Sequence, residues 1–247
     1  MSEHALPLIL YSAGILAGSL VGGMVPLFAD VRRRMDVLLG FAAGVMIGAA
    51  FFHMLPEAVH QGGAQSLAVV PLGFLALYIL ERFVLVHTCP EPEEGCEVHG
   101  TMGLAAFLGL SAHTVFAGVA LGSSVATGLG GMVFLAVVAH KIPGSLSLAS
   151  ILVHEKRSPA RVVAMLVALA LMVPVGALAY FALRGLFDVT RLTAGALAFS
   201  TGTFLYIALA DLLPQAHKKA SSRVAMVAAL VAGVAAMWGL SLLHHGH

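Results

Sequence analysis

Eight apolar stretches constrain the fold of this chain more than any other feature of its sequence. A bilayer core about 30 Å thick is crossed by roughly 20 helical residues, and each stretch is at least that long. Few residues lie between them. The sequence therefore predicts an all-α polytopic membrane protein, a single transmembrane domain over 1–247, with helices at approximately 5–28, 36–60, 66–87, 102–125, 131–153, 160–184, 190–215 and 222–244.

Composition excludes the other broad classes of protein. The 247 residues are 60% hydrophobic and 10% charged, with a mean hydropathy of +0.97, which is far too apolar for a soluble domain. The first stretch lacks the basic leader and the cleavage site of a removable signal peptide. The sequence contains no nucleotide-binding Gly-rich loop ending in Lys-Ser or Lys-Thr and no obvious nucleophile with its base. We therefore expect neither an ATP-driven pump nor an enzyme, and no nucleic-acid partner.

Basic residues predict the orientation, because Lys and Arg near helix ends tend to stay in the cytoplasm. Ten of the 13 basic residues end or follow the odd-numbered helices: Arg32, Arg33, Arg34, Arg82, Lys156, Arg157, Arg161, Lys218, Lys219 and Arg223. The loops on the other side of the membrane have only Arg184 and Arg191, and Lys141 lies within the fifth helix. Both termini are therefore expected outside the cytoplasm.

Two distant segments are near-copies of each other. They read GVMIGAAFFHMLPEAVH from residue 44 and GTFLYIALADLLPQAH from residue 202. When the two prolines are aligned, His53 falls on Asp211 and Gly44 falls on Gly202. Each copy carries its polar residue three positions before the proline. Ionisable groups inside a membrane segment are costly, so both residues are candidates for a transport pathway.

The two copies have opposite directions in the predicted topology, because helix two runs outward and helix seven runs inward. Inverted repeats of this kind are typical of secondary transporters, whose sites lie near the membrane midplane at the repeat interface. The sequence therefore predicts a 3+2+3 arrangement, in which two outer triplets are related as an inverted repeat and two central helices lie between them.

The central helices each carry one histidine at mid-depth. His113 lies within SAHTVFAGVALG, and His140 lies within AVVAHKIPGSLSLASIL, three residues before Pro143. A proline inside a helix removes a backbone hydrogen bond and frees a carbonyl that can coordinate a cation. Neutral imidazole is a common ligand of zinc and neighbouring metals, and zinc prefers about four ligands. The two histidines therefore supply half of a zinc site.

At these residues the chain resembles the ZIP family of divalent metal transporters. The resemblance spans essentially the whole chain and rests on HMLPEA in helix two, HTVFAGVALG in helix four, HKIPGSL in helix five, PVGA in helix six and GTFLYIALADLLP in helix seven. It implies passive or gradient-driven entry of Zn²⁺, sometimes Fe²⁺, Mn²⁺ or Cd²⁺, through a binuclear site between helices four and five. The metal is then substrate, no organic cofactor is expected, and a homodimer is one option.

The chain departs from the family's pattern at four ligand positions. Thr114 and Ala117 stand where helix four of the family usually has Asn and an acid, and Lys141 and Gly144 stand where helix five commonly has two acids. A lysine after the helix-five histidine also resembles one eukaryotic-type branch of the family. The resemblance there implies a site that holds one metal at most.

Lys141 is hard to reconcile with an adjacent metal. At an effective dielectric of about 20, a unit positive charge about 4 Å from a divalent ion costs on the order of 8 kcal/mol. Either Lys141 is neutral, or the metal lies elsewhere, or Lys141 pairs with Asp211 or Glu57, since buried charges are usually paired.

Three other intramembrane groups are candidate metal ligands. His53 and Glu57 are four residues apart and share one face of helix two, a spacing that suits a joint ligand pair or a hydrogen-bonded helix-end pair. The resemblance places them near the outer mouth. Asp211 lies within helix seven, where an unpaired carboxylate is expensive, so it is expected to contact the pathway or to have a partner.

A polar segment over 88–101, between helices three and four, is predicted to face the cytoplasm. Cys89 and Cys96 should stay reduced there, which favours thiolate metal binding over a disulfide. Together with His87 and His99 they supply enough ligands for one tetrahedral zinc. A flexible acidic linker is the alternative.

The predicted function is import of a divalent transition metal, Zn²⁺ first, across a bacterial cytoplasmic membrane, with His113 and His140 as central ligands. The alternative is a ZIP-type fold that has lost the binuclear site and acts as a metal sensor or partner-binding protein, or a transporter of altered substrate.

Overall fold

A computed structural model of the chain describes residues 2–28, 34–85, 101–126, 128, 130–186, 188–218 and 222–244. Within these ranges the chain is helical and contains no strand. Eight helical segments are long and apolar enough to cross a membrane, each overlapping one of the predicted stretches. The predicted all-α fold with eight membrane-spanning helices is confirmed.

Several spans contain short 3-10 or π-helical pieces, labelled η. Span one is α1 (Ser2–Met24) with η1 (Val25–Leu27), and span two joins α3 (Met35–Ala49), η2 (Ala50–Met54) and α4 (Leu55–Gly62). Span three joins η3 (Ala64–Val69), α5 (Val70–Ile79) and η4 (Leu80–Leu85), and spans four, five and six are α6 (Thr101–Ala126), α7 (Gly130–His154) and α8 (Pro159–Leu183). Span seven joins α9 (Val189–Tyr206), η5 (Ile207–Leu212) and α10 (Leu213–Lys218), and span eight is α11 (Arg223–His244).

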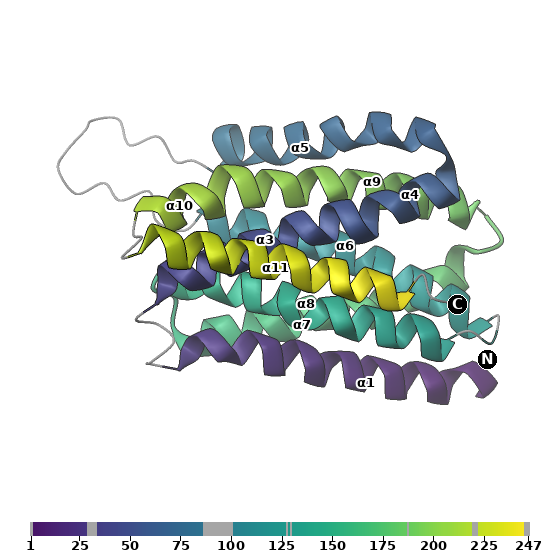
Figure 1. Cartoon of the computed structure of the whole chain (residues 1–247). Coiled ribbons are helices and arrows are strands. Elements are labelled where there is room, and N and C mark those ends of the chain that lie inside the picture. The colour runs from purple at the N-terminus through teal and green to yellow at the C-terminus, as the bar shows by residue number, and fades with distance from the viewer. Residues whose placement is uncertain are drawn as a thin grey trace.

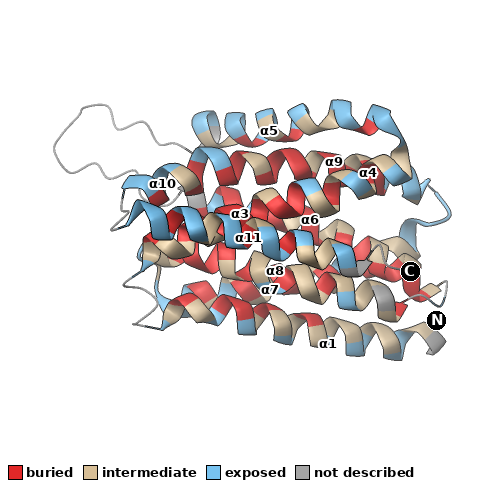
Figure 2. Cartoon of the chain, in the orientation of Figure 1, coloured by how far each residue is buried: buried red, intermediate tan, exposed pale blue. Residues whose placement is uncertain are grey.

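The spans form a central group and an outer group. Between 50% and 72% of spans two, four, five and seven is buried, against 17% to 39% of spans one, three, six and eight. Figure 2 shows the contrast between the buried α9 and the exposed outer faces of α5 and α11. Apolar side chains such as Leu72, Ile79 and Val231 cover those outer faces, as expected for helices in contact with lipid. The central group holds the buried ionisable side chains Asp36, His113, Lys141 and Asp211.

Helices pack against one another in matched pairs. Helix α3 packs closely on α11 and α9 on α5, while α1 packs on α7 and α8 on α6. The first two contacts depend on the aligned glycines of the repeat. A Cβ on Gly44 would lie 2.0 Å from the Leu230 carbonyl oxygen, and one on Gly202 would lie 2.0 Å from that of Val70. Small residues let membrane helices approach to this distance.

Both termini lie at the same end of the bundle (Figure 1). Spans one, three, five and seven end at the opposite end of the bundle. Among the described residues, Arg34, Arg157 and Arg223 lie at that end, whereas Arg184 and Arg191 flank the α8–α9 connection near the termini. The charge asymmetry of the sequence is therefore an asymmetry between the two ends of the bundle.

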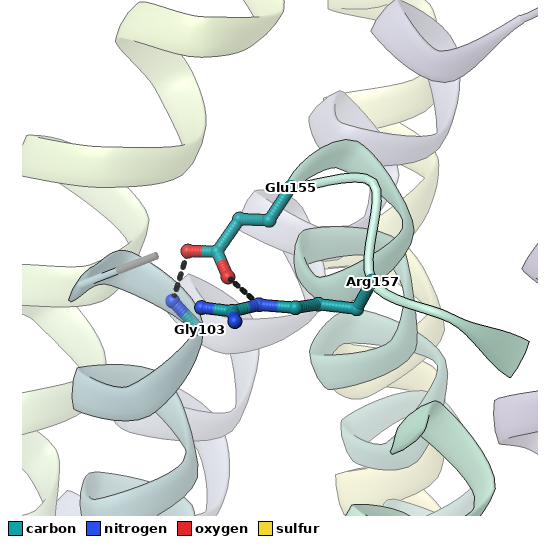
Figure 3. A network of polar contacts seen from close by, with 3 residues as sticks. All are labelled: Gly103, Glu155 and Arg157. Atoms are coloured by element: carbon teal, nitrogen blue, oxygen red, sulfur yellow. Dashed lines mark hydrogen bonds and ion pairs between the residues drawn. The ribbon is translucent and has the colours of Figure 1, made fainter. Parts of the chain in front are cut away.

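A carboxylate ties α6 to α7 at the basic end (Figure 3). Glu155 Oε1 accepts a hydrogen bond of 2.6 Å from the Gly103 backbone N–H, and its Oε2 lies 3.2 Å from Arg157 Nε. Lys156, between them, has a positive φ of 58°, and its N–H and that of Arg157 donate back to the last turn of α7. The carboxylate satisfies an otherwise unpaired donor in the first turn of α6, where the helix dipole also favours negative charge.

We expect Gly202→Val to disrupt the bundle, because the new side chain would overlap the α5 backbone, and overpacking costs about 1–3 kcal/mol or more. The matched control is Gly195→Val, seven residues earlier on α9, where a Cβ meets nothing within 4 Å. Thermal unfolding followed by size-exclusion chromatography in detergent measures the difference. Equal melting temperatures for the two variants would contradict the packing described here.

Candidate metal centre

Each copy of the sequence repeat contains a π-helical turn directly before its proline. In the first copy the Leu55 N–H donates to the Ala50 carbonyl, five residues earlier, and in the second the Leu213 N–H donates to that of Ala208. These are aligned positions of the two copies. A proline has no N–H and clashes with the carbonyl four residues before it, so a wider turn relieves both problems. The repeat therefore specifies a shared backbone irregularity at the depth of its polar residue.

Three histidines from three spans lie together in the middle of the bundle. The ring of His53, in η2, lies 4.8 Å from the ring of His140, in α7, and His140 lies 5.5 Å from His113, in α6, measured between ring centroids. Phe204 of α9 covers His113 edge-on at 5.2 Å. We call His53, His113 and His140 the histidine cluster.

The ring spacing suits chelation of one metal ion. With Zn–N bonds of about 2.0–2.1 Å, two imidazoles on a tetrahedral zinc have ring centroids about 5 Å apart. His113 Nδ1 and His140 Nε2 are buried and have no hydrogen-bond partner. Nevertheless, no group of three or more His, Cys, Asp or Glu side chains in the described ranges is already in metal-holding geometry. Two of the ring separations thus match those of imidazoles on a shared zinc, and binding would require the rings to rotate so that their nitrogens converge.

The unpaired nitrogen of His140 is the one that carries the lone pair. The ring bonds to the backbone carbonyl of Ala136, one turn earlier on α7. A carbonyl only accepts, so Nδ1 carries the proton and Nε2 is left as a free acceptor. Hydrogen bonds of this kind fix the tautomer and orientation of metal-binding histidines.

Lys141, beside the cluster, is bonded to Thr114. Its Nζ donates a hydrogen bond of 2.6 Å to Thr114 Oγ1, and that hydroxyl donates in turn to the Leu110 carbonyl at 2.6 Å. Lys141 and Thr114 are 5% and 1% exposed. The predicted pairing of Lys141 with Asp211 or Glu57 is not found; a hydroxyl on the neighbouring helix satisfies the amine instead.

Asp211 lies in a second polar group, away from the histidines. It is buried, its Oδ2 has no hydrogen-bond partner, and it interacts electrostatically with Glu81, Arg82 and Glu155. Glu81 in turn bonds to the hydroxyl of Tyr206. Phe204, which touches His113, precedes Asp211 by seven residues, or about 10 Å along a helix. Sequence reasoning missed Glu81, because a Glu–Arg pair at a helix end resembles an ordinary interfacial charge.

Glu57 lies one turn beyond His53, towards the end of the bundle that holds the termini. Its Oε1 accepts a hydrogen bond of 2.6 Å from Gln61 Nε2, and neither residue is fully buried. The structure thus separates the predicted pair: His53 joins the central histidines, and Glu57 lies nearer the end of α4.

The four predicted ligands of the polar segment, His87, Cys89, Cys96 and His99, lie outside the described residues.

Comparison with known proteins agrees with this architecture. The chain matches the family described as ZIP Zinc transporter over residues 5–100 and 86–241. It is 27% identical to zinc transporter ZIP9 of Micropogonias undulatus over 306 aligned residues, which cover 96% of this chain and 97% of that protein. It is 28% identical to ZIP9 of Xenopus tropicalis over 83% of this chain and 84% of the relative, and 28% identical to human zinc transporter ZIP2 over the same shares.

The fold is that of a polytopic membrane protein with ionisable side chains buried in its interior. The family match extends over nearly the whole chain. The chain belongs to the ZIP zinc transporter family.

The bond between Lys141 and Thr114 predicts a specific stability effect. Thr114→Val keeps the shape of the side chain but leaves the buried amine without its acceptor, a loss of about 1–3 kcal/mol. Thr114→Ser keeps the hydroxyl and should recover most of that loss. Thermal unfolding in detergent compares the three proteins; equal destabilisation by Ser and Val would mean that the methyl group, not the hydrogen bond, matters.

Proposed function

We propose that this protein moves a divalent transition metal, Zn²⁺ first among them, across the membrane through the histidine cluster. The observation that carries the proposal is the position of the His140 ring, 4.8 Å from the His53 ring and 5.5 Å from the His113 ring inside the bundle. Two of them present buried nitrogens without hydrogen-bond partners, an expensive arrangement that a bound cation would relieve. Zinc transport by the relatives supports the same substrate.

Polar side chains lie on both sides of the histidine cluster along the length of the bundle. Glu57 lies towards the end that holds the termini, and Asp211 lies towards the basic end with Glu81 and Glu155. A cation entering near Glu57 would be held by His53, His140 and His113 and leave past Asp211. His53 and Asp211 lie on either side of the central pair of histidines, and they are aligned residues of the two copies of the sequence repeat.

Import is the direction we infer. The basic end of the bundle faces the cytoplasm by the charge rule for membrane helices, which leaves both termini outside. The matched packing of α3 on α11 and α9 on α5 supports the 3+2+3 inverted repeat from which this topology follows. A bacterial cytoplasmic membrane stays a prediction from the sequence.

A sensor without transport is the second candidate. The observation that favours it is the position of Lys141, whose buried amine lies beside the histidines. A positive charge there would repel a passing cation. A sensor would bind the metal without carrying it to the other side.

Uptake of radioactive Zn²⁺ into proteoliposomes that contain the purified protein tests the proposal. We expect saturable uptake that is abolished in the His113→Ala/His140→Ala double variant, because two of the three imidazoles are gone. The matched control is His60→Ala, an exposed histidine on α4, which should transport like the wild type.

Two outcomes would contradict the transport proposal. Uptake that survives in the double variant would place the pathway elsewhere. Folded protein that binds Zn²⁺ at equilibrium but carries none into the vesicles would favour the sensor.

A further inference from the structure

Three exposed basic residues meet at one corner of the basic end of the bundle. Arg34 directly precedes α3, Lys218 ends α10 and Arg223 begins α11. Helix α10 packs on α3 and also contacts α11, so the three residues lie at the ends of helices that touch one another (Figure 1). We call Arg34, Lys218 and Arg223 the basic corner.

Glycine contacts determine the relative depth of Arg34 and Arg223. A Cβ on Gly40 would lie 2.9 Å from the Met226 carbonyl oxygen, and the glycine one turn later meets the carbonyl one turn later on α11. Helices α3 and α11 are therefore parallel and begin at the same end. Arg34 lies six residues before Gly40, and Arg223 lies three before Met226. The two arginines thus differ in depth by about three residues, or about 4.5 Å.

The charges of the basic corner form no ion pair with any described residue of the chain. Arg157 and Arg191, elsewhere in the bundle, pair with Glu155 and Asp188. Asp36, in the first turn of α3, is buried and already has an interaction partner. The exposed surface of the corner therefore carries positive charge that a ligand with negative charge would complement.

An apolar face of α11 begins directly after Arg223. Val224, Val227 and Val231 are 81%, 47% and 59% exposed, and their spacing places them on one side of the helix. Acyl chains in contact with this face would run along α11 and end at the level of Arg223. The phosphate of the same lipid would then lie at the depth of the basic corner.

We propose that the basic corner binds the phosphate of an anionic phospholipid whose acyl chains lie along the exposed face of α11. A soluble anion would match the charges but would make no use of the apolar face beside them. Arginine suits phosphate because its fixed donors match the phosphate oxygens. Each basic side chain near a membrane surface is worth about fivefold in the binding of anionic lipid. The site is separate from the histidine cluster and does not depend on metal transport.

Native mass spectrometry of the purified protein tests the inference. The protein is titrated in detergent with phosphatidylglycerol or with phosphatidylcholine of identical acyl chains, so that only the headgroup charge differs. The wild type should bind phosphatidylglycerol at least about fivefold more tightly. Arg34→Gln/Arg223→Gln should weaken binding of phosphatidylglycerol about tenfold and leave binding of phosphatidylcholine unchanged.

The matched control is Arg184→Gln/Arg191→Gln, which removes the same number of positive charges at the opposite end of the bundle. Both of its arginines already have partners: Arg191 pairs with Asp188, and Arg184 lies 5.4 Å from the centre of the Phe181 ring. This variant should bind phosphatidylglycerol like the wild type.

Four results would overturn the inference. The first is equal affinity of the wild type for the two lipids, and the second is a preference for phosphatidylglycerol that survives in Arg34→Gln/Arg223→Gln. Inorganic phosphate that displaces phosphatidylglycerol at similar concentrations would indicate a site for soluble anions. A dimer that excludes the lipid would indicate that a second copy of the chain covers α11.

A single substitution keeps the inference testable if the double variant does not fold. Lys218→Gln, at an exposed helix end, should weaken binding of phosphatidylglycerol about fivefold. An unchanged affinity in that variant would also contradict the basic corner as the lipid site.

Discussion

The cost of placing polar groups in hydrocarbon organises this protein. Lipid offers no hydrogen bonds, so ionisable side chains within membrane helices must lie inside the bundle or find partners. Four outer spans face lipid with apolar side chains, and four central spans enclose His113, Lys141 and Asp211. Enclosure leaves His113 Nδ1, His140 Nε2 and Asp211 Oδ2 without hydrogen-bond partners, which is costly for buried polar atoms.

The two copies of the sequence repeat each contribute to one of the two polar groups in the interior. Each copy brings a glycine into backbone contact with an outer helix and widens its helix into a π turn before a proline. The same device thus sets His53 against the central histidines and Asp211 among carboxylates nearer the basic end. In the proposed pathway, imidazoles in the middle and carboxylates beyond them would offer a cation successive sites of different chemistry.

Features that depend on local sequence could be predicted, and those that depend on how helices face each other could not. Hydropathy is enough to locate the eight spans, and spacing from the prolines is enough to single out His53 and His140. The partner of Lys141 is a hydroxyl 27 residues away on another helix, a contact that depends on the rotation of α6 and α7. Likewise, the bond of Glu81 to Tyr206 joins spans three and seven, and Glu81 lies in none of the motifs of the sequence.

Diffraction at the zinc absorption edge, from crystals grown with Zn²⁺, locates the metal without assuming a ligand set. If the histidine cluster is the metal site, an anomalous peak should lie about 2.0–2.1 Å from one ring nitrogen each of His53, His113 and His140, with their rings rotated inward. The peak should vanish in crystals of His140→Ala. Zinc bound in the membrane-spanning region at Asp211 and Glu81 alone, with the histidine cluster empty at saturating metal, would show that the histidines are not the site.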